Sequence, residues 1–382
     1  MNNVKNSSIV VVGAGIAGVT TAFHLARRGA RVTLVDDGGF GQATAASAGI
    51  IAPWVSSSEG AFYAAYAAGG GYYPEFLSQL EALGLPELGY RRSGALMVSA
   101  DAAEVDAAEE RIAGRVREAG PVAGTLERVD GARARELFPA LAPGLGGLFV
   151  SGGGRVDGRV LRDATLSGAV ASGARHLVDP VVAIEPSGAG WRIRTTTVNL
   201  DADAVVVAAG ARVTGLLGRL GLRVGVSPQR GQIVHLELRG VNTSPWPTLH
   251  PFAEHYMTPF DGGRIAVGAT RETGSGFDPR VTAAGQLSVL RNALELAPGL
   301  AEATVLETRV GIRPMADGGL PVVGRVPGSD GLWLLAGYGA AGLTMAPLLG
   351  DAVARDVLGE AAPELAAFTV AVERRSGGDE GR

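Results

Sequence analysis

Residues 9–18 read IVVVGAGIAG, and this stretch decides the fold that the sequence predicts. Its first four residues form a continuous apolar run, which is typical of a strand buried on both faces of a parallel sheet. Three glycines, Gly13, Gly15 and Gly18, follow at once in the spacing of a dinucleotide-binding turn. In such a turn the first glycine permits the bend, the second lets the backbone approach a pyrophosphate, and the third lets the next helix pack closely. The stretch therefore predicts a strand, a phosphate-binding turn and the start of a helix.

The residues that follow complete this unit. Thr20–Arg28 has the apolar spacing of a helix, Gly29 ends it, and Arg31–Val35 is a second strand that ends at Asp36. An acidic residue in this place accepts hydrogen bonds from the ribose hydroxyls of a bound dinucleotide. The candidate cofactor residues of the unit are Gly13, Gly15, Ile16, Ala17, Gly18, Asp36 and Asp37.

Composition excludes several other classes of protein. The chain has 382 residues and 46% hydrophobic residues, enough for a folded core rather than a disordered chain. The net charge is −4 with both signs mixed along the chain, which does not favour a nucleic-acid or polybasic membrane surface. Because there is no cysteine, we exclude disulfides, a thiolate nucleophile, a cysteine metal site and a thioether link to a cofactor. We expect no metal site.

The sequence shows neither a signal-peptide pattern nor an apolar run of the roughly 20 residues that span a bilayer. We therefore expect a cytoplasmic protein without a transmembrane segment. Residues 376–382, rich in glycine and charge, are expected to form a disordered tail.

Further motifs occur along the rest of the chain. They are ATAASAGII at 43–51, GRVDG at 154–158, VVVAAGA at 205–211, GIRP at 311–314 with DGGLPVVG at 317–324, and GYGAAGLTM at 337–345. In this order, and nearly from end to end, the chain resembles the D-amino-acid oxidase superfamily of FAD-dependent oxidoreductases. The resemblance is closest to the glycine oxidase and D-amino-acid dehydrogenase branches. One glycine appears as an insertion between the two parts of the fourth motif.

The resemblance implies FAD as the cofactor. Small residues at 43–51 suit a backbone that approaches a flat ring system, and the motif at 337–345 would lie at the pyrimidine end of the flavin. We expect noncovalent binding, because the chain has no cysteine and places no histidine convincingly beside the ring. The cofactor residues implied are Thr44, Ala45, Ser47, Ala48, Gly49, Ile50, Val182, Ala209, Gly210, Gly337, Gly339, Ala340, Gly342, Leu343 and Thr344.

The resemblance also implies a substrate site. Arg313 matches the arginine that binds the substrate carboxylate, a role that suits the planar, always charged guanidinium. Tyr256 matches a tyrosine that lines the glycine oxidase pocket, and Tyr338 stands where the family commonly has histidine. These three are the predicted catalytic residues. A second arginine common in glycine oxidases is Ala340 here, so carboxylate binding would rest on Arg313 alone.

Three further side chains are weaker candidates. His250 and His255 are expected to be partly buried, hydrogen-bonded histidines, and Trp54 is a candidate wall of the pocket.

We expect an α/β fold with a discontinuous, Rossmann-like FAD domain and an α+β substrate domain built on a large, mostly antiparallel sheet. The FAD domain would comprise residues 1–90, 146–226 and 305–375, and the substrate domain residues 91–145 and 227–304. Residues 101–119 should form a solvated helix of the substrate domain, and 264–268 the second strand of a hairpin.

The predicted reaction oxidises the C–N bond of an amino acid to an imine, which water hydrolyses to a 2-oxo acid and an amine or ammonia. Glycine, a D-amino acid, a sarcosine-like amine and an N-carboxymethyl adduct all fit, and the electron acceptor is oxygen or an electron carrier. Two alternatives stay open at this point. One is a nicotinamide-dependent dehydrogenase with the same fingerprint, and the other is a flavoprotein without catalytic activity. The sequence does not determine the oligomeric state.

Overall fold

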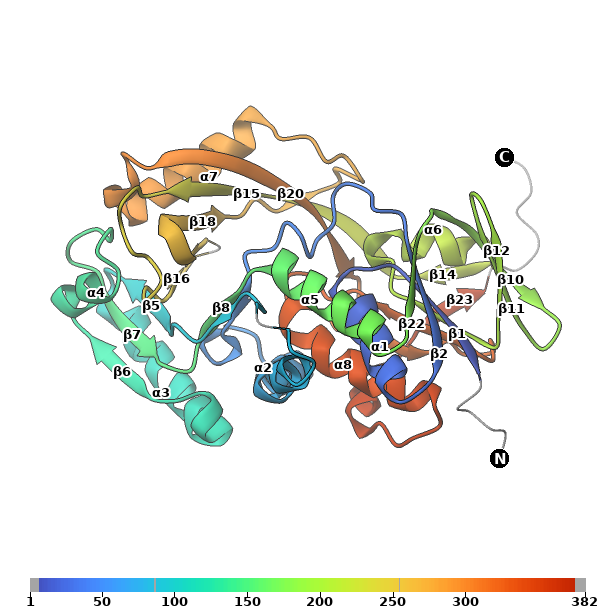
Figure 1. Cartoon of the computed structure of the whole chain (residues 1–382). Helices are drawn as coiled ribbons and strands as arrows, with labels where there is room; N and C mark the ends of the chain where they lie inside the picture. Colours follow the sequence, from blue (N-terminus) through green and yellow to red (C-terminus); the bar gives the residue numbers. More distant parts are fainter. Residues whose placement is uncertain (1–6, 86, 254, 375–382) are drawn as a thin grey trace.

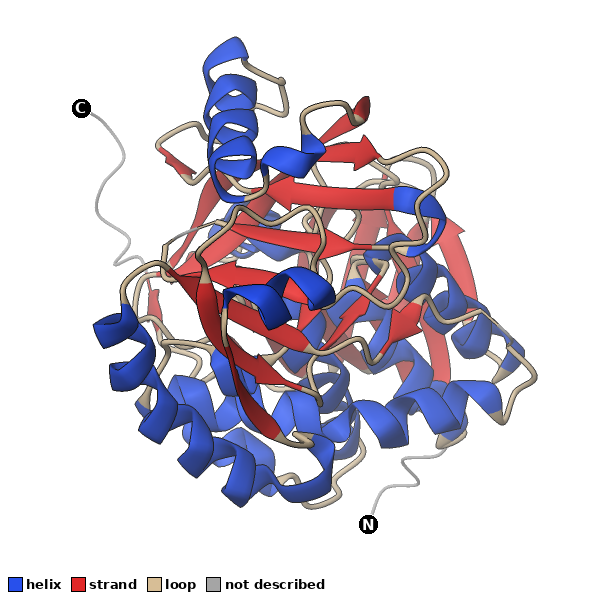
Figure 2. Ribbon diagram, turned by 90° about the vertical axis from the view of Figure 1, so that its left-hand side faces the viewer, coloured by secondary structure: helices blue, strands red, loops and turns tan. Residues whose placement is uncertain are grey.

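The computed structural model describes residues 7–374 except 86 and 254, so the tail predicted at 376–382 lies outside the described residues. Two sheets organise the chain, a six-stranded one on the right of Figure 1 and a nine-stranded one at its left and top. Figure 2 shows the strands gathered in the middle of the molecule, with helices above and below them.

The six-stranded sheet is the predicted Rossmann-like unit. Its strands are, in spatial order, β21 (Val322–Arg325), β22 (Leu332–Ala336), β13 (Ala204–Val207), β1 (Ser8–Val12), β2 (Arg31–Asp36) and β9 (Arg175–Val178). All neighbours from β22 to β9 are parallel, and β21 adds an antiparallel edge. Both faces of β1 are buried, which explains its uninterrupted apolar run. The predicted fold class is confirmed.

Four helices pack together beside the six-stranded sheet, whereas α3 (Ala102–Ala119), α4 (Gly131–Leu137) and α7 (Ala283–Leu296) pack on the nine-stranded one. α1 (Ile16–Arg27) lies against both α5 (Gly158–Ala171) and α8 (Gly342–Val357), and α2 (Gly60–Glu81) packs on α8. Within the described residues, the remaining α-helix is α6 (Val213–Gly218). The helix predicted at 101–119 is therefore α3.

α1 begins four residues earlier than the sequence pattern predicts. Gly15 caps it in an extended conformation, and Gly18 lies inside its first turn. Thr20 and Thr21 donate their hydroxyls to the carbonyls of Ile16 and Ala17, so these polar groups are satisfied within the buried helix. The sequence pattern does not reveal this start, because the residues of the glycine motif lack the helical spacing of apolar side chains.

The nine-stranded sheet carries the substrate side. Its strands are β19 (Glu272–Thr273), β15 (Val226–Glu237), β18 (Arg264–Gly268), β17 (Tyr256–Pro259), β16 (Thr248–Pro251), β5 (Ala95–Ser99), β7 (Gly146–Val150) and β6 (Leu126–Val129), with β20 (Thr304–Ala316) paired to β15. β17 and β18 form the predicted hairpin. β7 and β20 were assigned to the FAD domain, but both pair within this sheet. The division into two domains stays a prediction. Sheet pairing groups β7 and β20 with the strands of the predicted substrate domain.

Smaller sheets complete the chain. They are β3 (Ile50–Ile51), β8 (Gly154–Val156) and β4 (Tyr90–Arg91); β10 (Val181–Ser187), β11 (Gly190–Thr195) and β12 (Asn199–Ala202); and the pair β14 (Leu222–Val224) and β23 (Val372–Arg374). Asp157 caps α5, since its carboxylate accepts from the amides of Arg159 and Val160.

The hydrophobic core is divided by the sheets. One cluster joins the six-stranded sheet to α1, α2, α5 and α8, and another joins its opposite face to β11 and α6. Trp54 packs with α3 and β5 in a third cluster and is only 2% exposed. It does not line the cavity described below, so the expectation that it forms a pocket wall is wrong.

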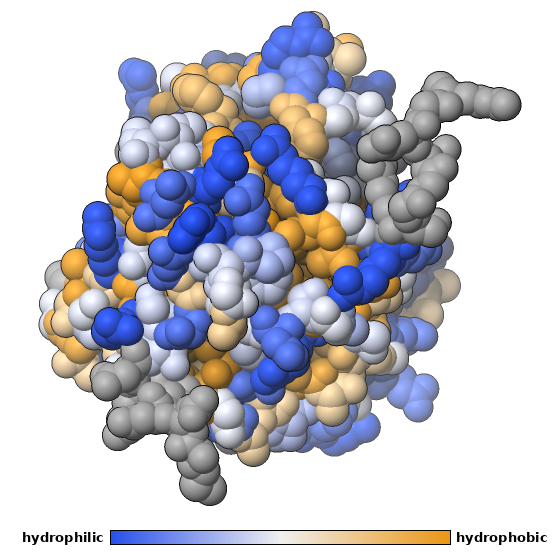
Figure 3. Space-filling model, turned by 90° about the vertical axis from the view of Figure 1, so that its right-hand side faces the viewer, coloured by the Kyte–Doolittle hydropathy of each residue, from blue (hydrophilic) through white to orange (hydrophobic). Residues whose placement is uncertain are grey.

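Within the described residues, no helix combines the length and apolar character that crossing a membrane requires. On the face that Figure 3 shows, hydrophilic and hydrophobic residues are interspersed.

Three histidines with lowered pKa values give the fold an acid sensitivity; His24 and His235 are buried, and His250 is partly buried. Burial lowers the pKa of His24 and of His235 to about 3, and that of His250 to about 4. An unfolded chain takes up these protons below a pKa of about 6.5, whereas the folded protein does not until its own lower pKa is reached. Stability is therefore fully present above pH 6.5 and falls as the pH drops toward 4.

We expect the free energy of unfolding to fall by about 1.4 kcal/mol per pH unit for each of these histidines between pH 6 and pH 5. Carboxylates with lowered pKa values contribute only below their unfolded pKa of about 4. Urea unfolding followed by tryptophan fluorescence measures the slope. His24→Gln should reduce it by about one histidine's share. An unchanged slope in this variant would show that His24 does not carry the effect.

Candidate active site

A large cavity lies between the two main sheets. Its volume is about 1270 Å³, more than the 300–1,000 Å³ typical of a small-ligand pocket and roomy enough for a dinucleotide with a small substrate. It opens beyond the carboxyl ends of β1, β2, β13 and β22, the edge where doubly wound sheets bind ligands. β15, β17 and β20 supply its other wall.

The three glycines of the first turn have three different surroundings. Gly13 has a φ of +103°, and a Cβ there would lie 2.5 Å from the carbonyl oxygen of Ala208. A Cβ on Gly18 would lie 1.7 Å from the carbonyl oxygen of Gly13. Gly15 lines the cavity, and its nearest contact would be the Thr44 hydroxyl at 3.4 Å. Gly13 and Gly18 are thus required by the chain itself, whereas Gly15 leaves space for a ligand.

Asp36 and Asp37 lie at the cavity edge after β2. The Asp36 carboxylate accepts from the amides of Ala14 at 2.7 Å and Gly38 at 2.8 Å, so it also holds the turn together. Asp37 forms an ion pair with Arg212. Both carboxylates line the cavity, as a ribose-binding role requires.

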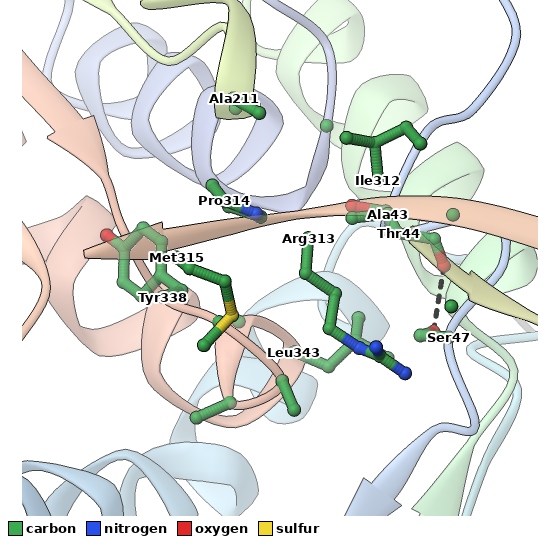
Figure 4. A pocket seen from close by; sticks show the side chains of 18 of the residues that line it. Ala43, Thr44, Ser47, Ala211, Ile312, Arg313, Pro314, Met315, Tyr338 and Leu343 are labelled. Carbon is green, nitrogen blue, oxygen red and sulfur yellow. Dashed lines mark hydrogen bonds between the residues drawn. The ribbon is translucent and has the colours of Figure 1, made fainter. Parts of the chain in front are cut away.

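The small-residue loop at 43–51 forms the neighbouring wall. Thr44 accepts from the amide of Ile16 at 3.0 Å and thereby ties the loop to α1. The Ser47 hydroxyl donates to the Thr44 carbonyl at 2.8 Å, the bond drawn in Figure 4. Gly49 has a φ of +76°, and a Cβ there would lie 1.8 Å from the Val156 carbonyl oxygen. The loop is therefore fixed by its own contacts rather than flexible.

The motif at 337–345 closes the opposite side. Gly337, Gly339 and Gly342 line the cavity, and α8 begins there with its N-terminus toward it. A helix N-terminus stabilises negative charge, which suits a reduced cofactor ring. Ala340 is exposed on the lining. The position that matches the second arginine common in glycine oxidases therefore carries no charge in this chain.

Most of the predicted cofactor residues line this one cavity. Those that do are Gly13, Gly15, Ile16, Ala17, Asp36, Asp37, Thr44, Ser47, Ala48, Gly49, Ile50, Val182, Ala209, Gly210, Gly337, Gly339, Ala340, Gly342 and Leu343. Gly18, Ala45 and Thr344 are outside the lining: Gly18 packs on Gly13, Ala45 accepts a hydrogen bond from Arg159, and Thr344 is 1% exposed and bonds to Ile50. Their roles in cofactor binding stay predictions, and in the structure these three residues lie beside the lining rather than on it.

Arg313 enters the cavity from β20, as Figure 4 shows. Its Nη1 donates to the Gln229 side-chain oxygen at 3.2 Å and to the Thr270 carbonyl at 3.0 Å. A Cβ on Gly231 would lie 2.4 to 2.6 Å from three guanidinium atoms, so the glycine leaves room for the arginine. These contacts fix a cation at the surface of the large sheet.

Tyr256 lies beside this cation. Arg313 acts electrostatically on the Tyr256 hydroxyl, and the tyrosine lines the same cavity. Burial raises the pKa of Tyr256 although Arg313 opposes the rise, so the hydroxyl is neutral at pH 7. The structure therefore brings together two of the three predicted catalytic residues.

Tyr338 has a different position. Its ring lines the cavity, but its hydroxyl is buried without a hydrogen-bond partner and, in Figure 4, lies on the side of the ring away from Arg313. Burial raises the pKa of Tyr338 far above its usual value. The ring of Tyr338 therefore forms part of an apolar wall. This position does not support the predicted catalytic role of Tyr338.

Sequence reasoning missed some of the cavity's charged residues. Arg271, directly after the β17–β18 hairpin, and Arg111 of α3 both line it. No apolar period or motif in the sequence marks Arg271. His250 and His255 also line the cavity; His250 bonds to the Thr248 hydroxyl at 2.9 Å, and its pKa of about 4 leaves it neutral at pH 7.

The cavity suits FAD in its glycine turn, its acidic edge, its helix N-terminus and its volume. The family described as FAD dependent oxidoreductase (DAO) matches residues 8–355.

This chain belongs to that family.

Three relatives show the extent of the likeness. An uncharacterized oxidoreductase, YurR of Bacillus subtilis, is 44% identical over 92% of this chain and 95% of its own length. Glycine oxidase of Pseudomonas putida is 30% identical over 90% of this chain and 92% of its own. The crystal structure of iminodiacetate oxidase from Chelativorans sp. BNC1 has a TM-score of 0.91 and 44% identity, covering 95% of this chain and 98% of that one. The chain is thus an FAD-dependent oxidoreductase of the amino acid oxidase type, which sets aside the nicotinamide alternative.

Proposed function

We propose that the enzyme oxidises the C–N bond of a glycine whose nitrogen carries a substituent. Among the substrates left open above, this class is supported by the similarity to an iminodiacetate oxidase, whose substrate by name is a nitrogen-substituted glycine. The observation that carries the proposal is Arg313, which presents a fixed cation between the large sheet and the predicted FAD wall. Such a cation selects a carboxylate.

Bound FAD supplies the acceptor for the two electrons and the hydrogen that leave the substrate's α carbon. The chain's own part is to hold the substrate, and for this Arg313 pairs with the carboxylate while Tyr256 supports the guanidinium. Holding the reacting groups in one geometry is itself a large part of catalysis. Loss of a hydride from the α carbon and of a proton from the nitrogen to water leaves the imine, which one water converts to glyoxylate and the released amine. The two electrons then pass from the cofactor to oxygen or to an electron carrier.

No strongly basic group is needed at the substrate nitrogen, provided that the amine reacts in its neutral form. His250 is neutral and buried at this end of the cavity, so it adds no charge there. Arg313 and Arg271 are both cationic lining residues that act on the neutral Tyr256 hydroxyl, so a second positive charge on the substrate nitrogen would be repelled. This surrounding favours a neutral amine over an ammonium.

Anaerobic flavin bleaching tests the proposal. We expect sarcosine and iminodiacetate to reduce the enzyme faster than glycine or D-alanine, and the matched amines without a carboxylate to react slowest. If none of these amines bleaches the flavin, the proposed function is wrong and the reading of a flavoprotein without catalytic activity gains ground. Reduction by D-alanine alone would instead favour a D-amino acid substrate. Repeating the assay with oxygen or an electron carrier identifies the acceptor.

A further inference from the structure

A buried carboxylate, that of Asp179, lies close to the dinucleotide end of the cavity. Asp179 is only 3% exposed. It accepts from the Thr195 hydroxyl at 2.6 Å, from the amides of Thr196 at 3.1 Å and Thr197 at 3.2 Å, and from the hydroxyls of Thr196 and Thr197. These hydroxyls lower the pKa of Asp179, so it is charged at neutral pH. The three threonines, which connect β11 to β12 and are called the threonine turn below, therefore stabilise a charge that would be costly to bury alone.

Asp179 connects two parts of the cavity wall. It lies between β9 and β10, and its amide donates to the carbonyl of Asp36 at 2.8 Å. The next three residues, Pro180, Val181 and Val182, line the cavity, as Asp36 does. Asp179 itself is outside the lining, so it acts on the cavity only through these neighbours. Figure 1 shows β10, β11 and β12 at the right of the molecule, beside α6.

The wall segment 180–182 is held at both of its ends. At its start, the Thr196 amide also donates to the Pro180 carbonyl at 3.0 Å, and Thr195 pairs with Val181 across the sheet. At its end, Arg219 donates to the Val182 carbonyl. An acidic residue after the second strand binds the ribose of the adenosine half of a dinucleotide. The segment beside Asp36 therefore faces that half of the cofactor rather than the flavin.

We propose that Asp179 is a positioning residue for FAD. Its carboxylate holds the threonine turn against segment 180–182 and thereby fixes the wall that receives the adenosine half. This role sets the affinity for the cofactor and leaves the chemistry at the flavin unchanged. It does not depend on the substrate, so it can be tested on apoprotein without turnover.

Asp179→Asn is the first test variant. Asparagine keeps the size of the side chain but replaces one acceptor oxygen by an amide donor. In either orientation of the amide group, the backbone N–H of Thr196 or of Thr197 then meets a donor. A buried donor without a partner is costly, so the turn should separate from the wall. We expect the Kd of the apoprotein to rise about tenfold for FAD and by the same factor for ADP, which contains the adenosine half alone.

Two titrations of the apoprotein make the measurement. FAD binding is followed by quenching of flavin fluorescence, and ADP binding by calorimetry. Asp179→Asn saturated with FAD should keep the wild-type visible spectrum, because the flavin end is not altered. The matched control is Asp201→Asn, an exposed carboxylate of β12 in the same sheet that pairs with Arg192 and lies outside the lining. Since exposed pairs contribute little, this control should keep both Kd values within about twofold of wild type.

A milder variant covers the case in which Asp179→Asn does not fold. Thr197→Val removes one hydroxyl donor at nearly constant volume, and Thr197 is exposed, so the fold should persist. We expect both Kd values to rise by about threefold. Unchanged values in Thr197→Val would overturn the proposal.

The ADP titration separates a positioning role from other effects. Equal rises for FAD and ADP in Asp179→Asn support the proposal, even if no amine reduces the flavin. A wild-type Kd for ADP in folded Asp179→Asn overturns it, and so does a rise for FAD alone, which would place the effect at the flavin half. If ADP does not bind wild-type apoprotein, segment 180–182 does not receive the adenosine half, and the proposal is equally wrong.

Discussion

Arg313→Ala is expected to lower kcat/KM for a carboxylated amine by at least about a hundredfold while FAD stays bound. Breaking a desolvated charge pair costs roughly 3–5 kcal/mol, because the remaining anion keeps its desolvation without a partner. Arg313→Lys should recover only part of the activity, since an ammonium cannot donate two parallel hydrogen bonds to a carboxylate. Anaerobic reductive titration with sarcosine and with a matched amine lacking the carboxylate measures both variants. The amine without a carboxylate should be nearly indifferent to either change.

A second variant keeps the positive charge of Arg313 but displaces its guanidinium group. In Gly231→Ala the new methyl group would lie 2.4 Å from Nη2 of Arg313, at the far end of a flexible side chain. The fold should tolerate this, because the guanidinium can shift, but the cation would leave its place beside Gln229 and Thr270. We expect a loss of at least about tenfold in kcat/KM, since small misplacements of a binding group are costly. Wild-type rates of flavin reduction in both Arg313→Ala and Gly231→Ala would make Arg313 a structural residue and remove the main support of the proposed function.

Gly15→Val should produce a folded protein that has lost most of its affinity for FAD. The φ and ψ of Gly15 are −71° and 176°, which any residue adopts, and its Cβ would have only an ordinary contact with Thr44 at 3.4 Å. The side chain would instead fill space that the pyrophosphate needs. Losing two charge-assisted backbone hydrogen bonds reduces affinity by at least about a hundredfold. The measurement is the FAD released to the supernatant by acid precipitation of the purified protein, compared with the colour left in the pellet.

Two matched glycines separate a cofactor effect from a folding effect. Gly71 is an exposed position in α2 where a Cβ would meet no atom within 4 Å, so Gly71→Val should retain FAD. Gly18→Val should instead impair folding, because its Cβ would lie 1.7 Å from a backbone oxygen. Full FAD occupancy in Gly15→Val would show that the cofactor lies elsewhere. Yellow colour that stays in the pellet of the wild-type protein would contradict noncovalent binding of FAD.

Local sequence patterns predicted the Rossmann-like unit well, because its strands are short, apolar and separated by glycine turns. β2 begins at Arg31 and ends at Asp36, as expected. The cavity lining was predictable for the same reason: a motif tied to one backbone geometry places the same atoms wherever it occurs. Arg313 could be found because a motif surrounds it.

The features that sequence patterns did not predict have a different physical origin. Whether Trp54 faces a cavity or a core depends on α3, which lies about fifty residues later in the chain and covers it. The direction of the Tyr338 hydroxyl depends on the side chains packed around its ring, and those come from distant elements. Arg271 was missed because its place in the site comes from a hydrogen bond between Thr270 and a strand more than forty residues away. Contacts of this kind leave no local pattern.

β20 is paired along β15 from Thr304 to Ala316, and it continues past Arg313 into the cofactor wall. There the amide of Gly339 donates to the Pro314 carbonyl at 2.8 Å, and Met315 forms a β-bridge with Tyr338. The substrate anchor and the wall of the cofactor site are therefore parts of one continuous hydrogen-bonded backbone. The segment that carries Arg271 is joined to the same frame, since the amide of Thr270 donates to the Gln232 carbonyl of β15 and Glu272 pairs with Arg230 in the sheet. A shift of β20 would therefore move Arg313 and this part of the predicted cofactor wall together.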